Sequence, residues 1–209
     1  MTDHDAGKKY YEFIAKTVLE KYLPSEFFEL EMPDIPDLRT KDGKGIEVTI
    51  ANSQNDMEAS FLFEKIKGRS LKEADPKTIK KMKKLRQEIL FYPESDRIFG
   101  FSPIEDSMHN DDIRKSTLKK IDKISNYKID TDLFIFAPVM GFYDDNEISD
   151  YICWAKEKQK NNIKRYLTVF IFDYCSLYKC NIESESFERI NIDRDDMDLI
   201  IHQALELYY

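Results

Sequence analysis

Apolar residues recur every three or four positions in several stretches of the chain, a spacing typical of helices with one buried face. The first stretch is representative, because Ile14, Ala15 and Val18 share one stripe. Asp75 before Pro76, and Asp193 further on, are suited to cap the helices that follow them. The expected helices span residues 8–22, 56–67, 76–90, 111–127, 146–161 and 195–207.

Three shorter segments show strand patterns. Residues 132–137 and 166–174 are continuous apolar runs, which indicate strands buried on both faces. Residues 45–51 alternate instead, which indicates a strand with two different faces. Residues 92–110 are left as a loop without assignment. The order of elements predicts an α/β domain in which helices flank a sheet, and no internal repeat or long linker divides the chain.

The segment 36–51 predicts a hairpin with one acid on each strand. Asp42-Gly43 favours a tight turn between the strands. In the second strand, Glu47 projects from the face opposite the aliphatic residues. The hairpin would bring Asp37 and Glu47 towards each other, and two adjacent carboxylates repel unless a cation lies between them. A hard divalent metal with oxygen ligands is the usual solution.

This spacing resembles the PD-(D/E)-x-K superfamily of restriction-endonuclease-like nucleases: Pro36-Asp37, nine intervening residues, then Glu47-Val48-Thr49. The resemblance implies a mixed central sheet flanked by helices and covers residues 8–175. We therefore expect one domain over residues 8–209, with a helical and loop insertion at 65–110. Residues 1–7 are polar and are expected to be disordered. Thr49 departs from the family pattern, which has a lysine at that position.

The resemblance also implies a chemistry. Asp37, Glu47 and the backbone carbonyl of Val48 would bind Mg²⁺ or Mn²⁺. Some members of the superfamily recruit the lysine from a neighbouring helix, and Lys120, followed by Lys123, is the candidate to replace what Thr49 lacks. Some members place a further acid on the first helix, and Glu12 flanks the apolar stripe there. The implied activity is metal-dependent hydrolysis of phosphodiester bonds.

Charge is distributed unevenly along the chain. The net charge is −8, but residues 65–86 contain ten lysines and arginines and only two acids. This segment therefore carries +8 and the remainder −16, a distribution that suits contact with a polyanion on one face. We expect DNA, with RNA as the alternative, to be contacted by the lysines of the helix that follows Asp75: Lys77, Lys80, Lys81 and Lys84.

Other classes of protein fit less well. No apolar run approaches the ~20 residues of a membrane span, and the polar N-terminus lacks a signal-peptide core. We therefore expect a cytoplasmic protein without a membrane partner. Three cysteines without C-x-x-C spacing argue against a disulfide scaffold, and Cys153 and Cys175 are expected in the core. The six glycines form no phosphate-binding loop.

Simpler interpretations stay open beside the nuclease hypothesis. Asp37 could be a turn residue after proline, Glu47 could lie on the wet face of an edge strand, and Lys120 could be solvated. The chain could then be a catalytically inactive nuclease-fold protein that binds nucleic acid or protein. It could also be an acidic binding partner unrelated to that fold. The sequence does not decide whether the protein is a homodimer.

Overall fold

The computed structural model describes residues 3–51, 58–59, 62–63, 65–85, 87–103, 109–137 and 144–208. The chain forms two compact units: Met1–Ala51 together with His109–Tyr209, and Asn52–Met108. The second unit is an insertion that begins earlier than the 65–110 segment expected from the sequence. Within the described residues no helix is long and apolar enough to span a bilayer.

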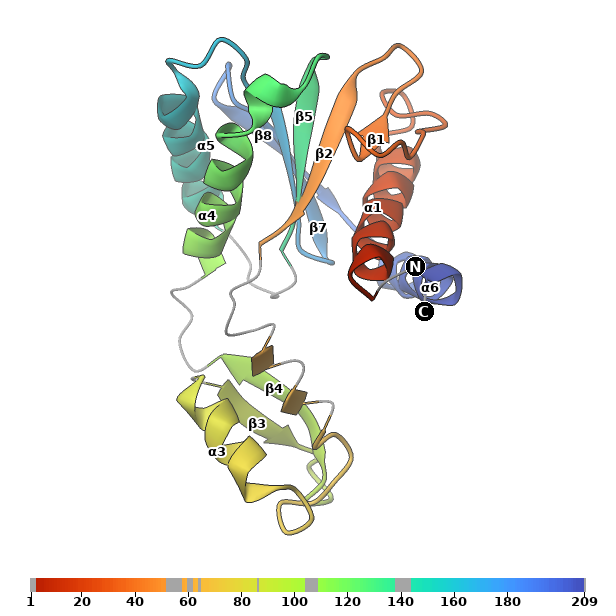
Figure 1. Ribbon diagram of the computed structural model, residues 1–209, viewed down its shortest axis with the longest axis vertical. Coiled ribbons are helices and arrows are strands. Elements are labelled where there is room, and N and C mark those ends of the chain that lie inside the picture. Colours follow the sequence, from red (N-terminus) through yellow and green to blue (C-terminus); the bar gives the residue numbers. More distant parts are fainter. Residues whose placement is uncertain are drawn as a thin grey trace. The chain divides into compact units, whose positions relative to one another are not determined.

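The first unit contains a mixed sheet of six strands in the order β1-β2-β5-β6-β7-β8 (Figure 1). β2, β5 and β6 are parallel to one another, whereas the outer pairs are antiparallel. The strands are β1 (Leu38–Arg39), β2 (Gly45–Ile50), β5 (Thr131–Phe136), β6 (Thr168–Phe172), β7 (Ser176–Asn181) and β8 (Ser186–Asn191).

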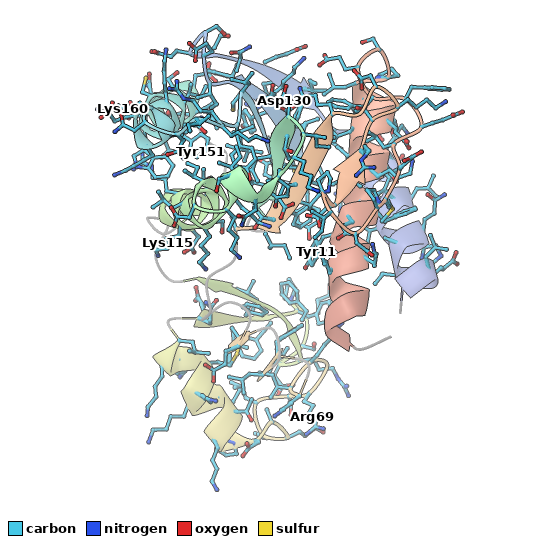
Figure 2. The ribbon with its side chains drawn as sticks, turned by 45° about the horizontal axis from the view of Figure 1, so that its top comes forward. Tyr11, Arg69, Lys115, Asp130, Tyr151 and Lys160 are labelled. Carbon is cyan, nitrogen blue, oxygen red and sulfur yellow. The ribbon has the colours of Figure 1, made fainter. Side chains whose placement is uncertain are left out.

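Helices cover both faces of this sheet. α1 (Asp3–Tyr22) and α6 (Arg194–Tyr208) share a core with one face, in which Tyr11 contacts Phe136 at 5.0 Å between ring centroids. α4 (His109–Ile121) and α5 (Asp145–Gln159) share a second core with the other face, where Tyr151 is buried. Figure 2 labels Tyr11 and Tyr151 in these two layers. The predicted α/β class, a mixed sheet flanked by helices, is confirmed.

The second unit combines a helix with a two-stranded sheet. α3 (Pro76–Lys84) begins as predicted, because the Asp75 carboxylate accepts the backbone N–H groups of Lys77 and Thr78. The helix ends at Lys84, so its predicted extension to Leu90 is wrong. β3 (Gln87–Phe91) follows and pairs with β4 (Ile98–Pro103), which occupies the segment left as a loop. Ile89 continues the helical spacing, but its cross-strand partner was not visible in the local sequence.

Several boundaries of the first unit also differ from the expectation. α1 begins at Asp3, within the segment 1–7 that was expected to be disordered. α4 ends at Ile121, and a short 3₁₀ helix, η2 (Ile124–Asn126), takes up the predicted remainder. Part of the expected helix 56–67 lies outside the described residues; 58–59 and 62–63 are helical. Asp193 caps α6 as predicted, since its carboxylate accepts the N–H groups of Asp195 and Asp196.

The hairpin of β7 and β8 was missed for a conformational reason. Turns that enter the left-handed region are usually marked by glycine. Here Tyr174 before β7 and Glu185 before β8 adopt positive φ, 69° and 52°. The turns therefore lack the usual sequence signal. The expected burial of Cys153 and Cys175 is also wrong: both are exposed, and the Cys153 thiol contacts Glu185.

Replacing Phe170 by Ala should lower the free energy of unfolding by about 3–5 kcal/mol, the usual cost of such a cavity. Phe170 is fully buried on β6 and contacts Phe27 and Phe134, with ring centroids 5.6 and 6.4 Å away. The matched control is Phe28→Ala, because Phe28 is 65% exposed, and it should change stability by less than about 1 kcal/mol. Urea denaturation of both variants measures the difference; similar losses would contradict the assigned core.

Candidate functional site

The predicted hairpin is present and sets the position of both acids. β1 pairs antiparallel with β2, with Leu38 opposite Ile46. The turn closes through hydrogen bonds from Thr40 N–H to the Lys44 carbonyl and from Gly43 N–H to the Thr40 carbonyl, 2.9 and 3.0 Å. Gly43 has φ 91°, which a residue with a side chain rarely adopts. Extending the register by one residue places Asp37 opposite Glu47.

Asp37 is buried and is held directly against β2. Its Oδ2 accepts the backbone N–H of Val48 at 2.8 Å. Its Oδ1 lies 2.9 Å from the Lys8 ammonium of α1. A residue that served only the turn would not need this fixed, buried contact with the next strand. The carboxylate therefore belongs to the edge of the sheet.

The backbone of Val48 faces the same edge as Asp37. The N–H groups of Gly45 and Ala51 bond to carbonyls of Asp130 and Phe136, each at 2.8 Å, so odd-numbered residues of this segment face β5. Val48 is an odd number of residues from Gly45 and from Ala51, so its backbone faces away from β5. On that side its N–H donates to the Asp37 carboxylate. Because the N–H and C=O of a strand residue point to the same side, the Val48 carbonyl also points towards that edge.

Glu47 projects to the α4 side of β2, where it forms an ion pair with Lys120. The two side chains are 10% and 20% exposed, so water screens this pair only partly. The Tyr127 hydroxyl also hydrogen-bonds to Glu47. Burial of the hydroxyl is the largest cause that raises the pKa of Tyr127 above its ordinary value, and the hydrogen bond to Glu47 is the second. The Tyr166 hydroxyl donates to the Lys120 carbonyl at 3.3 Å and steadies the end of α4.

The ammonium of Lys120 thus lies beside the second acid of the hairpin. Thr49 is two residues from Glu47 on β2, half-buried, and shares its face of the sheet. A lysine at Thr49 would project to this same side of β2. Lys123 directly precedes η2 and is exposed. Of the two lysines singled out in the sequence, Lys120 is the one that contacts a predicted metal ligand.

Glu12 brings a third acid from α1 and is 1% exposed. It lies 3.2 Å from the Lys8 amine and 2.9 Å from the Lys9 amine, but neither carboxylate oxygen has a well-oriented hydrogen bond within the described residues. Burial raises the pKa of Glu12; Lys9 opposes this shift, and the negative charge of Asp37 adds to it. Two ammonium groups already approach this buried carboxylate, so its surroundings favour a cation.

The donor set is chemically suited to a hard divalent ion. Glu12, Asp37, Glu47 and the Val48 carbonyl are all oxygen donors, which Mg²⁺ and Mn²⁺ prefer. In this structure the acids are paired with lysines: Glu12 and Asp37 share Lys8, and Glu47 contacts Lys120. Within the described part of the chain, no group of three His, Cys, Asp or Glu side chains is already arranged around a common point.

The lysines predicted to bind nucleic acid belong to the other unit. Lys77, Lys80, Lys81 and Lys84 are exposed on α3, whereas Thr78 and Met82 form its buried side. Lys81 also forms an ion pair with Glu58. The structure thus places these lysines in the second unit and the acids in the first unit, which contains the six-stranded sheet.

Four further residues surround the acids and were not expected from the sequence: Lys8, Lys9, Tyr127 and Tyr166. Lys8 had a local signal, because it lies one helical turn before Glu12 at i,i+4 spacing. Lys9, at i,i+3, had the same kind of signal. Tyr127 and Tyr166 had none, since they approach Glu47 and Lys120 from segments distant in sequence.

Comparisons with family models, with curated proteins and with solved structures found no match to this chain.

Proposed function

We propose that the protein is a metal-dependent nuclease that hydrolyses phosphodiester bonds in DNA on a restriction-endonuclease-like core. The supporting observation is the contact between Lys120 and Glu47. It brings the positive charge that Thr49 lacks from α4 to the strand that carries the second acid. The buried Asp37, directly before β1, and Glu12 on α1 add the carboxylates that such a site uses.

Each residue has a distinct role in this proposal. Asp37, Glu47 and the Val48 carbonyl, with Glu12 nearby, would hold Mg²⁺ or Mn²⁺. When bound, the metal would supply an activated water and offset charge on the phosphate. Lys120 donates hydrogen bonds to the attacking water or to a phosphate oxygen, where negative charge develops. Glu47 and the Tyr166 contact with the α4 backbone orient that amine.

The direct test uses supercoiled plasmid and single-stranded DNA incubated with Mg²⁺, with Mn²⁺, or with EDTA. The proposal requires nicked, linear or shortened products that depend on the metal and are absent with Glu47→Ala protein. RNA of the same sequence serves as the competing substrate.

The second candidate is an inactive nuclease-fold module that binds nucleic acid or protein, and Thr49 is the feature that favours it. Binding of DNA without cleavage under any metal would select this candidate.

The exposed lysines of α3 should make the contact with nucleic acid. Reversing the charge of Lys77, Lys80, Lys81 and Lys84 together should weaken DNA binding at least tenfold at low salt. It should also flatten the salt dependence, since each neutralised phosphate adds about 0.9 to the slope. Fluorescence anisotropy over a salt series measures both quantities.

The matched control reverses four exposed lysines of the other unit: Lys21, Lys41, Lys158 and Lys160. This control has the same net charge as the α3 variant, so a difference in slope reports the location of the contact. If both variants show the same slope, DNA is bound by the general field of the protein and not by α3.

A further inference from the structure

We propose that Lys8 is an exchangeable counter-ion of the candidate site: it bridges Asp37 and Glu12, leaves when a divalent metal binds, and then contacts the substrate phosphate. This inference rests on the metal site of the proposed function. It assigns a task to a residue outside the hairpin and outside the helix of Lys120.

The Lys8 ammonium lies between the two buried acids. Its Nζ is 2.9 Å from Asp37 Oδ1 and 3.2 Å from Glu12 Oε1. A divalent ion bound to these oxygens needs metal–oxygen distances of ~2.0–2.6 Å. The ammonium and the metal would then occupy overlapping space and would repel each other as like charges. Binding of the metal at these two acids therefore requires the amine to move away.

Exposure decides which group moves. The side chains of Asp37 and Glu12 are only 4% and 1% exposed, and Asp37 is also fixed to β2 by the Val48 N–H. The Lys8 side chain is 52% exposed. Its flexible four-carbon stem lets the amine swing into water without unfolding any element. The acids stay in place and the lysine exchanges.

Lys9 lacks this bridging geometry and provides the natural comparison. Its amine contacts Glu12 Oε2 at 2.9 Å, and among the described residues it forms an ion pair with that one acid. Lys120 pairs with Glu47 and with neither of the acids that Lys8 bridges, among the ion pairs of the described residues. Lys8 alone, among the ion pairs that the described residues form, links two of the predicted ligands.

The charge balance gives the released amine a destination. Glu12, Asp37 and Glu47 carry three negative charges, which Lys8, Lys9 and Lys120 offset. When a divalent ion replaces Lys8, the acids with the two remaining lysines become net positive, and the displaced ammonium adds to that field. A phosphodiester anion restores the balance. Metal binding would thereby prepare the site for its substrate.

The first experiment titrates Mn²⁺ into DNA-free protein by calorimetry. Lys8→Met removes the competing charge and keeps the side-chain length, so it should bind Mn²⁺ at least ~10-fold more tightly than wild type, about 1.4 kcal/mol. Lys8→Arg, which keeps the charge, should stay near wild type. Lys9→Met should change the affinity less than Lys8→Met. Circular dichroism confirms that the variants are folded.

Each result has a defined meaning. Unchanged or weaker Mn²⁺ affinity of folded Lys8→Met overturns the exchange while leaving the nuclease proposal intact. Tighter binding in a protein that cleaves nothing supports the exchange and contradicts the nuclease. No Mn²⁺ binding by wild type or by Lys8→Met, in a protein that also cleaves no DNA, overturns both. Cleavage without DNA-free Mn²⁺ binding overturns the exchange alone.

The second experiment follows the amine to its destination. DNA binding is measured by anisotropy with Ca²⁺ as the divalent ion, and again in EDTA. Lys8→Met should weaken DNA binding about three- to tenfold with the ion, where the amine is free to contact phosphate. In EDTA, where the amine is held by the acids, the loss should be smaller. Equal losses under both conditions overturn the transfer to phosphate.

Discussion

Replacing Glu47 by Ala should abolish metal-dependent cleavage, with the rate falling ~10³-fold or more. The change removes a carboxylate of the predicted metal site. Metal ions lower the activation free energy of such reactions by several kcal/mol, and about 1.36 kcal/mol corresponds to a tenfold change in rate. It also leaves the Lys120 amine without its partner on β2. Metal affinity should therefore fall together with the rate. Plasmid nicking and Mn²⁺ calorimetry on the same preparation measure the two effects.

The control for this variant is Glu188→Ala, which removes an exposed carboxylate from β8 on the far edge of the sheet. It should leave cleavage and metal binding unchanged. A Glu47→Ala protein that binds Mn²⁺ like wild type would show that the metal, if it binds, uses other ligands. The hairpin would then have no catalytic role.

Replacing Lys120 by Met should lower the cleavage rate by ~10²–10⁴-fold, the usual size of a lost acid–base or electrostatic group. Metal binding should survive, because all the carboxylates remain. The two variants thus separate two functions that share one contact: Glu47→Ala loses metal and rate, whereas Lys120→Met loses only rate. Single-turnover cleavage at saturating Mn²⁺ gives the comparison.

Lys119→Met is the matched control, because Lys119 is an exposed lysine at the same end of α4. Its rate should stay within about twofold of wild type. A loss confined to Lys123→Met would identify the other lysine of the sequence hypothesis as the functional one. If neither substitution lowers a measurable rate, no lysine from this segment replaces the one absent at Thr49.

The parts of the fold that could be predicted depend on local patterns. The hairpin followed from alternation in β2 and from Asp42-Gly43, both of which act within a few residues. The position of Lys120 on a helix followed from spacing alone, but its contact with Glu47 needed the superfamily resemblance as a guide. In both cases the relevant signal lay close to the residue concerned.

The missed elements depend on distant partners. β3 looked helical because Ile89 continues the spacing of α3, and pairing with β4 decides its conformation. The connections before β7 and before β8 contain Tyr174 and Glu185, which adopt positive φ although neither is glycine. Tyr127 reaches Glu47 only because the chain folds back after α4. No pattern within a short window contains these contacts.

The place of the insertion along the chain has a consequence for how such a protein can change. The insertion, residues 52–108, interrupts the first unit between β2 and α4. These two elements carry Glu47 and Lys120. These elements also contact each other directly, since the Ser116 hydroxyl donates to the Ile50 carbonyl at 3.1 Å. The two points at which the insertion joins the first unit are therefore held together by contacts within the first unit itself. A different segment could be exchanged at this junction while the acids and Lys120 keep their framework, so the recognition and the chemistry proposed above would evolve separately.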